Sequence, residues 1–307
     1  MELEKYYRKS SVILSAILIL FSIGMIYPMG ISVMEGLSVY SLQIIFMFIL
    51  LAMMFLIIDA KRLMFSSLLG AAILCLFLKN NSNRNLVMPE VNTDAQVSIA
   101  HFNLSSLEPD VAQLFAIVND TKADVLSFQE FTPLWKEVLD SVVVDSYPHS
   151  IEIMRIDPFG LSIFSKIPYD HVDTSYVSGI PIVCFGVSAA HETIELVSTY
   201  ISPPLDSYSK EIAESQLSAM NIILSASNFP HMVVGEFNDV YWSNRVRTFR
   251  NDNNLVNSRR NTTVTSLDIP LDHIFHSESL ECIQFSEVLD KADRKVGILG
   301  NYQIINP

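Results

Sequence analysis

The sequence predicts an α+β domain of two packed sheets with helices outside, preceded by a helical transmembrane region. Three observations support this fold class. The first 80 residues contain long windows without any charged residue. Downstream, short strand-like runs outnumber helical runs, and the distances between strands mix hairpin and crossover lengths.

The two regions differ sharply in charge. The chain has 307 residues, of which 50% are hydrophobic and only 17% are charged, whereas an ordinary soluble domain has about 25% charged residues. Residues 1–85 carry 7 Lys/Arg and 4 Asp/Glu, and the rest carries 13 and 29. The net charge of −13 therefore combines a slightly basic N-terminal region with a strongly acidic domain, which argues against a general polyanion binder. Three cysteines cannot form a disulfide framework.

Three charge-free windows define the N-terminal region. They are Ser10–Met34, Gly36–Ile58 and Leu63–Leu78, with lengths of 25, 23 and 16 residues. A helix needs about 20 apolar residues to cross the hydrocarbon core, so the first two are long enough. The third can span if Arg62 and Lys79 extend to the interfaces. We therefore expect a membrane anchor at 1–80 with about three transmembrane helices.

The positive charges around these windows predict the orientation. Basic residues precede the first window, and Lys61 and Arg62 follow the second, which places both sites on the cytoplasmic side. Three spans then place the C-terminal domain outside the cytoplasm, in the periplasm of a bacterial inner-membrane protein. If the third window lies in the interface instead, the domain is cytoplasmic. A cleaved signal peptide is the alternative interpretation of the first window. The length of that window and the apolar run that follows it disfavour a signal peptide.

A polar, proline-containing stretch separates the anchor from the soluble part. Residues 79–92 (KNNSNRNLVMPEVN) are typical of a linker, which we place at 81–94. The domain at 95–307 is long enough for one large core.

The first half of the domain alternates strands and helices. Gln96–Asn103 alternates as a strand does, and Glu108–Lys122 has helical apolar spacing. Asp124–Glu130 is a short apolar strand with a polar end. Thr132–Leu139 is predicted to be a helix, with Thr132 as its cap and Pro133 in its first position.

The second half contains mostly strands. One long helix is expected at Ser207–Ala226, and a buried strand at His231–Gly235 leads into the sequence GEFND. The other expected strands are Gly160–Ser165, Ile182–Ala189, Thr193–Ile201, Leu271–Phe275, Leu280–Leu289 and Val296–Ile304.

Polar side chains stand at the ends of four of these strands, where scaffolds commonly present functional groups. They are Asn103, Gln129 with Glu130, Glu236 with Asn238, and Asp272 with His273. Carboxylate and amide oxygens suit Mg²⁺, Mn²⁺ or Ca²⁺. No Cys/His cluster has the sequence spacing of a zinc site, so no structural zinc site is expected. The chain also has no P-loop and no GxSxG motif.

Six short motifs in order resemble the endonuclease/exonuclease/phosphatase superfamily, which includes deoxyribonucleases, apurinic endonucleases, sphingomyelinases and inositol-polyphosphate phosphatases. The motifs are HFN ending at Asn103, FQE ending at Glu130, GLSIFS at 160–165, STY ending at Tyr200, GEFN at 235–238 and PLDHIF at 270–275. The resemblance covers about residues 96–304 and is greatest to bacterial members with N-terminal membrane spans. It implies a four-layer α/β/β/α sandwich.

The resemblance also implies a reaction, namely metal-assisted attack of water on a phosphoester. Glu130 would be the main ligand of Mg²⁺ or Mn²⁺, with Asn103 beside it. Glu236 would position or deprotonate the water, and Asn238 would contact the phosphate. Asp272 would orient a catalytic histidine near the C-terminus. Tyr200 stands where other members have His or Tyr, and it could donate to a phosphate oxygen.

Two departures from the family pattern bear on activity. Glu236 replaces the usual Asp of GDFN. The usual C-terminal SDH is replaced by the stretch Ala292–Val296 (ADRKV), which has no histidine. Asp293 could keep the acidic role, and either Arg294 or Lys295 could stand at the histidine position. Both can bind phosphate, but neither is a general base near neutral pH.

Other polar residues have simpler interpretations. His101, His149 and His273 are expected to be structural or plain polar residues. Cys184 and Cys282 are expected in the core, although an oxidising compartment would permit a bond between them. A cluster of five arginines beyond GEFND could reverse the acidic charge locally, but a solvated helix face is the preferred interpretation. Its members are Arg245, Arg247, Arg250, Arg259 and Arg260.

Two hypotheses follow. The first is a membrane-anchored, metal-dependent phosphoric ester hydrolase acting on a lipid head group, a nucleotide or a nucleic acid. The second is an inactive family member that binds a phosphate-containing ligand or partner at the membrane. In both, the lipid bilayer is a partner, and the sequence indicates no obligate protein partner. Retention of Asn103, Glu130, Asn238 and Asp272 favours the enzyme.

Overall fold

The computed structural model describes residues 2–28, 30–85, 89–91, 96–189, 192–260 and 269–305. Parts of the expected linker, 86–88 and 92–95, lie outside the described residues. Two compact units are present. One holds Met1–Arg84 together with Val240–Arg247, and the other holds Asn85–Asp239, Thr248–Arg260 and Pro270–Pro307.

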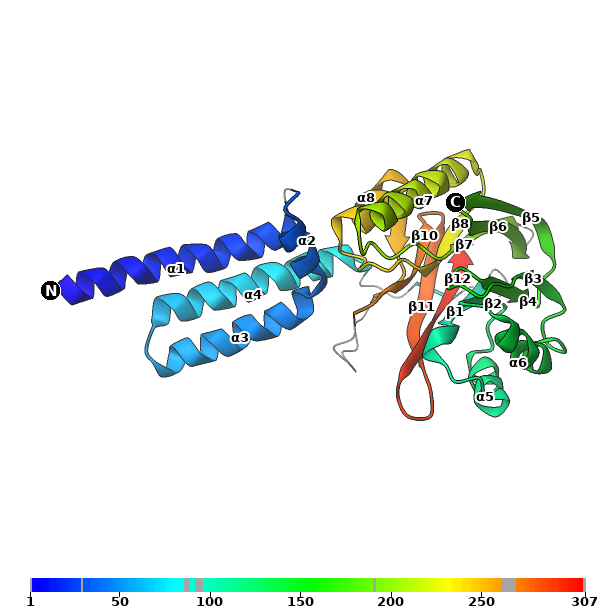
Figure 1. Ribbon diagram of the computed structural model, residues 1–307, viewed down its shortest axis with the longest axis horizontal. Helices are drawn as coiled ribbons and strands as arrows, with labels where there is room; N and C mark the ends of the chain where they lie inside the picture. The colour runs from blue at the N-terminus through cyan, green and yellow to red at the C-terminus, as the bar shows by residue number, and fades with distance from the viewer. Residues whose placement is uncertain are drawn as a thin grey trace. The chain divides into compact units, whose positions relative to one another are not determined.

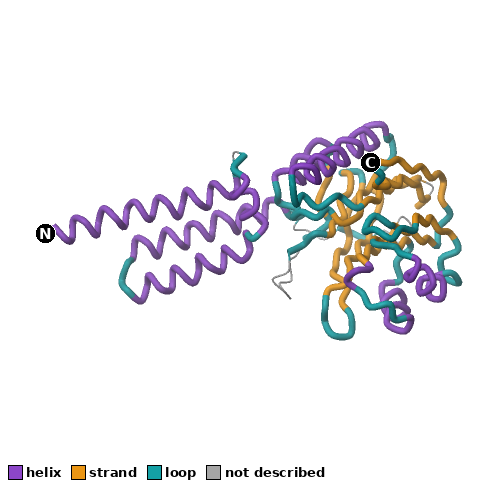
Figure 2. The backbone as a smooth tube through the Cα atoms, viewed as in Figure 1, coloured by secondary structure: helices purple, strands orange, loops and turns teal. Residues whose placement is uncertain are grey.

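The first unit is mainly helical (Figures 1 and 2). Its helices are α1 (Glu2–Ile26), α2 (Ser32–Val39), α3 (Ser41–Ile57) and α4 (Lys61–Asn81). By length and composition, α1 and α4 can each cross a membrane. The α2–α3 pair is bent by 86° and counts as at most one further crossing. Two crossings are therefore available within the described residues, or three if the bent pair is one span.

Apolar side chains hold α1, α3 and α4 together. Phe48 of α3, Leu74 of α4 and Met25 of α1 share one buried cluster. A second cluster joins Phe55 of α3 to Leu63 of α4. Since these contacts occur at both ends of α3, this helix packs along α4 for most of its length, and the chain direction reverses between the two (Figure 1). In the same unit, Trp242 is buried and its Nε1 donates to the Ser38 carbonyl at 2.7 Å.

The second unit contains two six-stranded mixed sheets. The first sheet has the order β11-β12-β1-β2-β4-β3, in which β1 and β2 are parallel and the other neighbours are antiparallel. Its strands are β1 (Gln96–Asn103), β2 (Val125–Gln129), β3 (His149–Ile153), β4 (Leu161–Ser165), β11 (Leu280–Leu289) and β12 (Lys295–Ile304).

The second sheet has the order β5-β6-β7-β8-β10-β9. Only β7 and β8 are parallel within it. Its strands are β5 (Tyr169–Val177), β6 (Ile180–Ala189), β7 (Glu192–Thr199), β8 (His231–Glu236), β9 (Leu255–Asn257) and β10 (Asp272–Ser277).

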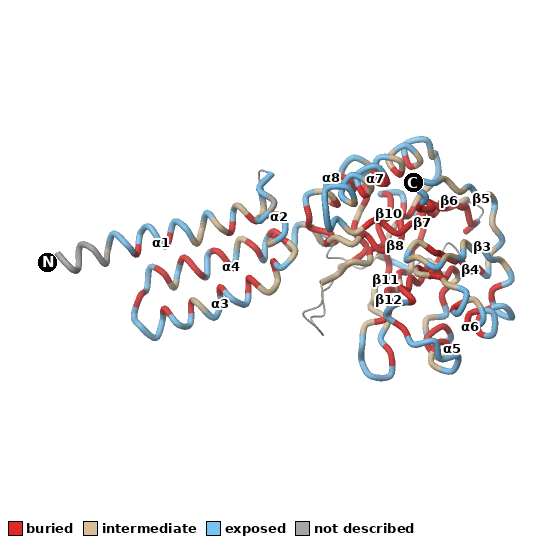
Figure 3. Tube along the Cα trace, viewed as in Figure 1, coloured by how far each residue is buried: buried red, intermediate tan, exposed pale blue. Residues whose placement is uncertain are grey.

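The main core lies between the two sheets, where buried residues concentrate (Figure 3). Alternate residues of β1, such as Val97 and Ile99, share a cluster with Phe185 of β6 and Val234 of β8. A second cluster lies on the outer face of the first sheet and packs it against α5 (Val111–Thr121) and α6 (Pro133–Val143). It includes Phe102 and Phe128, whose rings stack at 5.2 Å.

Helix α7 (Ser207–Ala226) packs against the second sheet. Its side chains Ala213, Leu217 and Met220 are buried, and Gln216 bonds the chain after β7 through the Tyr200 carbonyl and the Ser202 amide. The helix begins with a capping box at Asp206. With α8 (Asn244–Asp252) following β8, the order helices, sheet, sheet, helices confirms the predicted four-layer sandwich.

The expected strands and helices of the C-terminal domain are all present, with ends that differ by a few residues. Thr132 occupies the cap position of α6 without a side-chain cap bond, and Pro133 is the first helical residue. The prediction missed β3, β5 and β9, which are all edge strands. An edge strand buries fewer side chains, so its apolar pattern is weak; β3 and β5 contain no fully buried residue. Helix α8 lies where the helix-face interpretation of Arg245, Arg247 and Arg250 places a helix.

Candidate active site

The polar ends of the predicted strands meet at one end of the space between the sheets. Strands β1, β2 and β8 end there, with Asn103, Gln129 and Glu236 as their last residues. Strands β10 and β12 begin there, because they run antiparallel to β8 and β1. Asp272, the first residue of β10, is directly opposite Glu236. Lys295 is the first residue of β12.

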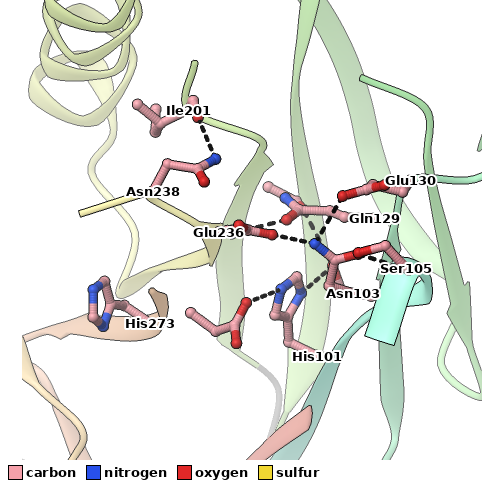
Figure 4. A network of polar contacts seen from close by, with 12 residues as sticks. His101, Asn103, Ser105, Gln129, Glu130, Ile201, Glu236, Asn238 and His273 are labelled. Atoms are coloured by element: carbon pink, nitrogen blue, oxygen red, sulfur yellow. Dashed lines mark hydrogen bonds and ion pairs between the residues drawn. The ribbon is translucent and has the colours of Figure 1, made fainter. Parts of the chain in front are cut away.

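Asn103 is at the centre of this site (Figure 4). Its Nδ2 donates to Glu130 Oε1 at 3.1 Å and also to Glu236 Oε2. Its Oδ1 accepts from the amide and the hydroxyl of Ser105, at 2.9 and 2.8 Å. Asn103 therefore brings the carboxylates of the two sheets together. Glu130 has a φ of 60°, a left-handed conformation that is uncommon for glutamate and typical of residues held in place for function.

Gln129 joins the two sheets beneath the site. It is fully buried, its Nε2 donates to the Thr199 carbonyl at 2.5 Å, and its Oε1 accepts from the Glu236 amide at 2.8 Å. Gly235 is required here. A Cβ at this position would lie 2.1 Å from the Thr199 oxygen, and its φ of 152° disfavours other residues. The glycine of GEFN thus allows the close approach that sets the position of Glu236.

Burial and neighbouring charge raise the pKa of Glu236. Burial is the main cause, and the negative charges of Asp272 and Glu130 add to it, so that the pKa is about 7. A carboxyl group of this pKa exchanges a proton near neutral pH, as a general base must.

Asp272 has the opposite behaviour. Burial disfavours its charge, but the His101 ring and the Lys295 ammonium hold its pKa below the ordinary value. His101 Nε2 lies 3.6 Å from Asp272 Oδ1, and Lys295 Nζ lies 3.4 Å from Oδ2. Two adjacent carboxyl groups thus have different pKa values, which separates a proton-exchanging group from a permanent anion.

The structure resolves which residue stands beside Asp272 in place of the expected histidine. Lys295 points to Asp272, whereas Arg294 pairs with Asp290 at 2.7 Å and is 60% exposed. Asp293 is an exposed turn residue with a φ of 58°, and its amide bonds the Asp290 carbonyl. The expectation that Asp293 keeps an acidic role therefore fails on geometry, and of Arg294 and Lys295 only Lys295 reaches Asp272.

Asn238 and Tyr200 complete the site on the side of the second sheet. Asn238 Nδ2 donates to the Ile201 carbonyl at 2.9 Å, and its side chain also hydrogen-bonds the Tyr200 hydroxyl. Burial is the main cause of a Tyr200 pKa of about 12, and Glu236 and Glu130 contribute. The phenol therefore remains a neutral donor. All six residues that the sequence singled out, Asn103, Glu130, Tyr200, Glu236, Asn238 and Asp272, come together here.

His101 is the residue that the sequence analysis undervalued. It is fully buried, and its Nδ1 contacts Ser127 Oγ at 3.3 Å, which in turn contacts Ser198 Oγ at 3.2 Å. A signal was available in the strand, because His101 and Asn103 are two residues apart and point to the same face. His101 lies beneath Asp272 and orients that carboxylate.

The remaining histidine expectations agree with the geometry. His273 Nε2 contacts the Asp239 carbonyl at 2.8 Å, and its ring stacks on Phe275. Burial lowers its pKa to about 3, so the ring is neutral. His149 lies on the edge strand β3 and packs against Tyr169. These two residues have structural roles.

Two members of the arginine cluster, Arg250 and Arg259, do not lie on the solvated helix face that was expected. Arg250 and Arg259 are 7% and 3% exposed. Arg259 pairs with Glu287 at 2.7 Å and lies over the Phe285 ring, and Arg250 lies over Phe275. The interpretation fails because the planar guanidinium groups pack on aromatic rings. Cys184 and Cys282 are buried with free thiols. Cys282 lies in the core between the sheets, but Cys184 does not.

The donor set fits a hard divalent cation. Glu130 and Glu236 offer carboxylate oxygens. Asn103 directs Nδ2 at both carboxylates while its Oδ1 accepts from Ser105, so its amide would have to turn for Oδ1 to join them as a ligand. The carboxylate of Glu236 is in electrostatic contact with those of both Glu130 and Asp272. A cation would relieve this repulsion, and Mg²⁺ prefers such ligands.

The fold and the site together define a class: a two-sheet sandwich with an oxygen-rich acid and amide cluster at one end of the inter-sheet core. The profile of the endonuclease/exonuclease/phosphatase family matches residues 100–295, so the chain belongs to this family. Members of the family are hydrolases of phosphoester bonds and generally use divalent metal ions. Among curated proteins, none matches the sequence.

Solved structures of the family share the fold. A family protein from Beutenbergia cavernae has 12% identity and a TM-score of 0.55, covering 68% of this chain and 72% of its own. D. rerio TDP2 in complex with a single-strand DNA product has 12% identity and a TM-score of 0.56, with coverages of 68% and 100%. A Bacteroides thetaiotaomicron mannosyl-6-phosphatase has 14% identity and a TM-score of 0.50, with coverages of 68% and 100%.

Proposed function

We propose that the chain is a divalent-metal-dependent phosphoester hydrolase that is anchored in a membrane by its N-terminal helices. The observation that carries this proposal is the bridge formed by Asn103 between Glu130 and Glu236, with Asp272 opposite Glu236. Four separate strand ends supply these groups. A merely structural cluster has no need to bring three carboxylates together.

Each side chain has a distinct role in the proposed reaction. Glu130 and Asn103 hold Mg²⁺ or Mn²⁺, which when bound stabilises negative charge on the phosphate. Glu236, which Asn103 bridges to Glu130 and which lies opposite Asp272, accepts a proton from the attacking water. Asn238 and Tyr200 donate hydrogen bonds to phosphate oxygens. Asp272 stays ionised, and His101 orients it.

Lys295 replaces the histidine of the family pattern. Its ammonium lies 3.4 Å from Asp272 and is 15% exposed, so it can bind a phosphate oxygen as a cation. The site therefore keeps its water-activating base, Glu236, but lacks the second acid–base group, and we expect slow turnover.

The Lys295–Asp272 ion pair is also the observation that favours a second function. A site with a fixed cation at the histidine position can bind a phosphate group without hydrolysing it. Such a protein would present a phosphate pocket at the membrane for a ligand or partner. Hydrolysis with Mg²⁺ distinguishes the two functions.

The test is hydrolysis of phosphodiester and phosphomonoester panels by the full chain in detergent with Mg²⁺ or Mn²⁺. Glu130→Gln and Asn238→Ala should each reduce kcat/KM by about 100-fold or more, as expected for groups that act in the transition state. Glu137→Gln, an exposed carboxylate-to-amide change on α6, is the control and should have no effect. Activity that is absent, or equal in all variants, would contradict the enzyme.

Substrate choice is open among phosphoesters. The similar structures include one with a DNA product and one named as a sugar phosphatase. Residues 86–307 have a net charge of −16 by the counts above, and the buried, paired Arg250 and Arg259 do not reverse it on the surface. We therefore favour a small or lipid head-group phosphoester over a long nucleic acid.

We further propose three membrane spans within an anchor at 1–80, followed by a linker at 81–94 and the catalytic domain at 95–307. The packing of α3 along α4 supports a crossing by α3 as well as by α1 and α4, because a helix that packs along a membrane-spanning helix lies at the same depth in the membrane. With Lys61 and Arg62 cytoplasmic, the domain lies outside, in the periplasm of a bacterial inner membrane. A periplasm-specific reporter fused after Asn85 should be active, and an inactive reporter contradicts this topology.

A further inference from the structure

A second cluster of metal-binding side chains lies on the second sheet, away from the Asn103 site. Its members are His171 of β5, Cys184 of β6 and Glu195 of β7, three consecutive strands. Val183, Phe185 and Val187 of β6 face the core between the sheets. Because side chains alternate along a strand, Cys184 faces the opposite side. The cluster is therefore on the outer face of the second sheet.

Strand register explains how the three residues meet. Gly186 of β6 is opposite His171 on one side and Glu195 on the other, so the three positions form one row across the sheet. Cys184 is two residues before Gly186 and shares its face. The row places an imidazole, a thiol and a carboxylate from three strands on the same small area.

Gly186 provides the space for this meeting. A Cβ at Gly186 would lie 2.6 Å from His171 Cε1 and 2.7 Å from Nδ1. The imidazole therefore lies over the glycine and reaches Glu195, with Nε2 at 3.4 Å from Oε2. On another side the ring stacks on Phe229, with centroids 6.3 Å apart. A larger residue at position 186 would remove His171 from the cluster.

The buried carboxylate gives an independent indication of a ligand. Glu195 is 7% exposed, and its Oε1 has no hydrogen-bond partner among the described residues. A buried carboxylate oxygen without a partner is costly. The Cys184 thiol hydrogen-bonds the Glu195 side chain, and the negative charges of Glu195 and Asp173 act on it. The site thus combines one unpaired carboxylate oxygen with two carboxylates near a thiol, and a cation would satisfy both.

We infer that His171, Cys184 and Glu195 form a zinc-binding site on the outer face of the second sheet. One ligand atom from each residue lies within 4.8 Å of the others, a spread that one ion can bridge by small side-chain rotations. Nitrogen, sulfur and carboxylate oxygen are the ligands of Zn²⁺, whereas Mg²⁺ and Ca²⁺ prefer oxygen alone. With three protein ligands a fourth position stays open, and His171, whose side chain is 38% exposed, gives access to it from solvent.

The site holds together three strands that are consecutive in the chain, and its effect on the protein should be stabilisation. Its ligands lack the short spacing of a zinc motif because each comes from a different strand. The exclusion of zinc from sequence spacing applies to motifs within one turn or hairpin, and not to residues that strand register aligns.

The test uses Co²⁺ as a spectroscopic substitute for Zn²⁺ on the metal-stripped full chain in detergent, with excess Mg²⁺ present to occupy the oxygen-rich site. We expect one equivalent of Co²⁺ to produce a thiolate-to-cobalt charge-transfer band that Zn²⁺ abolishes. Cys184→Ser should remove the band, and Glu195→Gln should weaken Zn²⁺ affinity by about tenfold or more. The control Cys282→Ser changes a buried thiol outside the cluster and should keep the band.

Gly186→Ala tests the geometry without changing a ligand. The added methyl should displace His171 and weaken Zn²⁺ binding by about tenfold or more. Zn²⁺ should raise the thermal unfolding temperature of the wild type and of Cys282→Ser, but not that of Cys184→Ser. The inference is overturned if no charge-transfer band forms, if Cys184→Ser retains it, or if Zn²⁺ stabilises all variants equally. Phosphoesterase activity is not part of this readout, so the result is independent of the proposed function.

Discussion

The ion pair between Lys295 and Asp272 allows a quantitative test of the site's electrostatics. The perturbations are Lys295→Met, Asp272→Asn and the double variant. The charged atoms are 3.4 Å apart, and the side chains are 15% and 18% exposed. At an effective dielectric constant of about 20, the attraction is about 5 kcal/mol before desolvation. Partial desolvation of both groups offsets roughly half of it, so we expect a coupling energy of about 2–3 kcal/mol.

The single variants should differ in their effect. Lys295→Met removes the cation and leaves Asp272 beside Glu236, the residue opposite it in the β8–β10 pair. We expect a loss of about 3 kcal/mol in the free energy of unfolding at pH 7, because an uncompensated buried charge remains. Added Mg²⁺ should recover part of this loss by replacing the positive charge. Asp272→Asn should cost less, and the double variant should cost less than the sum.

The assay is chemical unfolding of the full chain in detergent, followed by near-ultraviolet circular dichroism, with and without Mg²⁺. The pair Arg155–Asp157 is the control. It is bonded at 2.6 Å, but its side chains are 32% and 38% exposed, so its cycle should give less than about 1 kcal/mol. A Lys295–Asp272 coupling below about 0.5 kcal/mol, or no larger than the control, would refute the reasoning.

Three further predictions concern activity, backbone conformation and pH. Lys295→His should restore an acid–base group beside Asp272 and raise kcat on a phosphodiester at least about tenfold at pH 7; an unchanged or lower kcat contradicts this. Gly235→Ala should lower the free energy of unfolding by more than about 3 kcal/mol or prevent folding, because its Cβ would lie 2.1 Å from a backbone oxygen. Gly179→Ala is the control: it has open space but a φ of 78°, and the loss should be about 1 kcal/mol. Equal losses in thermal unfolding would refute the steric argument. Burial lowers the pKa of His276 to about 4 from about 6.5. Between these pH values His276 is therefore protonated in the unfolded chain and neutral in the folded chain. The contribution of His276 to the free energy of unfolding should therefore fall by about 3 kcal/mol between pH 6.5 and 4. His276→Leu should make the pH slope in urea unfolding less steep by that amount; an unchanged slope contradicts the prediction.

Much of the site was predictable because it follows from strand ends. Asn103, Glu130, Glu236 and Asp272 each stand where an apolar run changes to polar residues, and sheet pairing brings such ends together. The replacement at the histidine position was not predictable. A β-turn at 290–293, closed by the bond from the Asp293 amide to the Asp290 carbonyl, precedes β12. After this turn Arg294 pairs with Asp290 and Lys295 points to Asp272.

The burial of charged and polar groups also could not be predicted from the sequence. Arg250 and Arg259 are typical surface residues by composition, yet both pack on aromatic rings inside the domain. The spacing of His101 from Asn103 shows that the two share a strand face, but only the approach of the second sheet places Asp272 above His101. Such contacts join residues far apart in the chain, so no local pattern records them.

The sequence by itself determined the division into an apolar N-terminal region and an acidic α+β domain, and the order of the site motifs. Both depend on local properties, namely hydropathy over one helix length and alternation along one strand. Tertiary structure alone decided which carboxylate has a raised pKa, which cation replaces the histidine, and that His171, Cys184 and Glu195 share one face. Those properties depend on strand register and on the exclusion of water between packed layers, which arise only when distant segments come together.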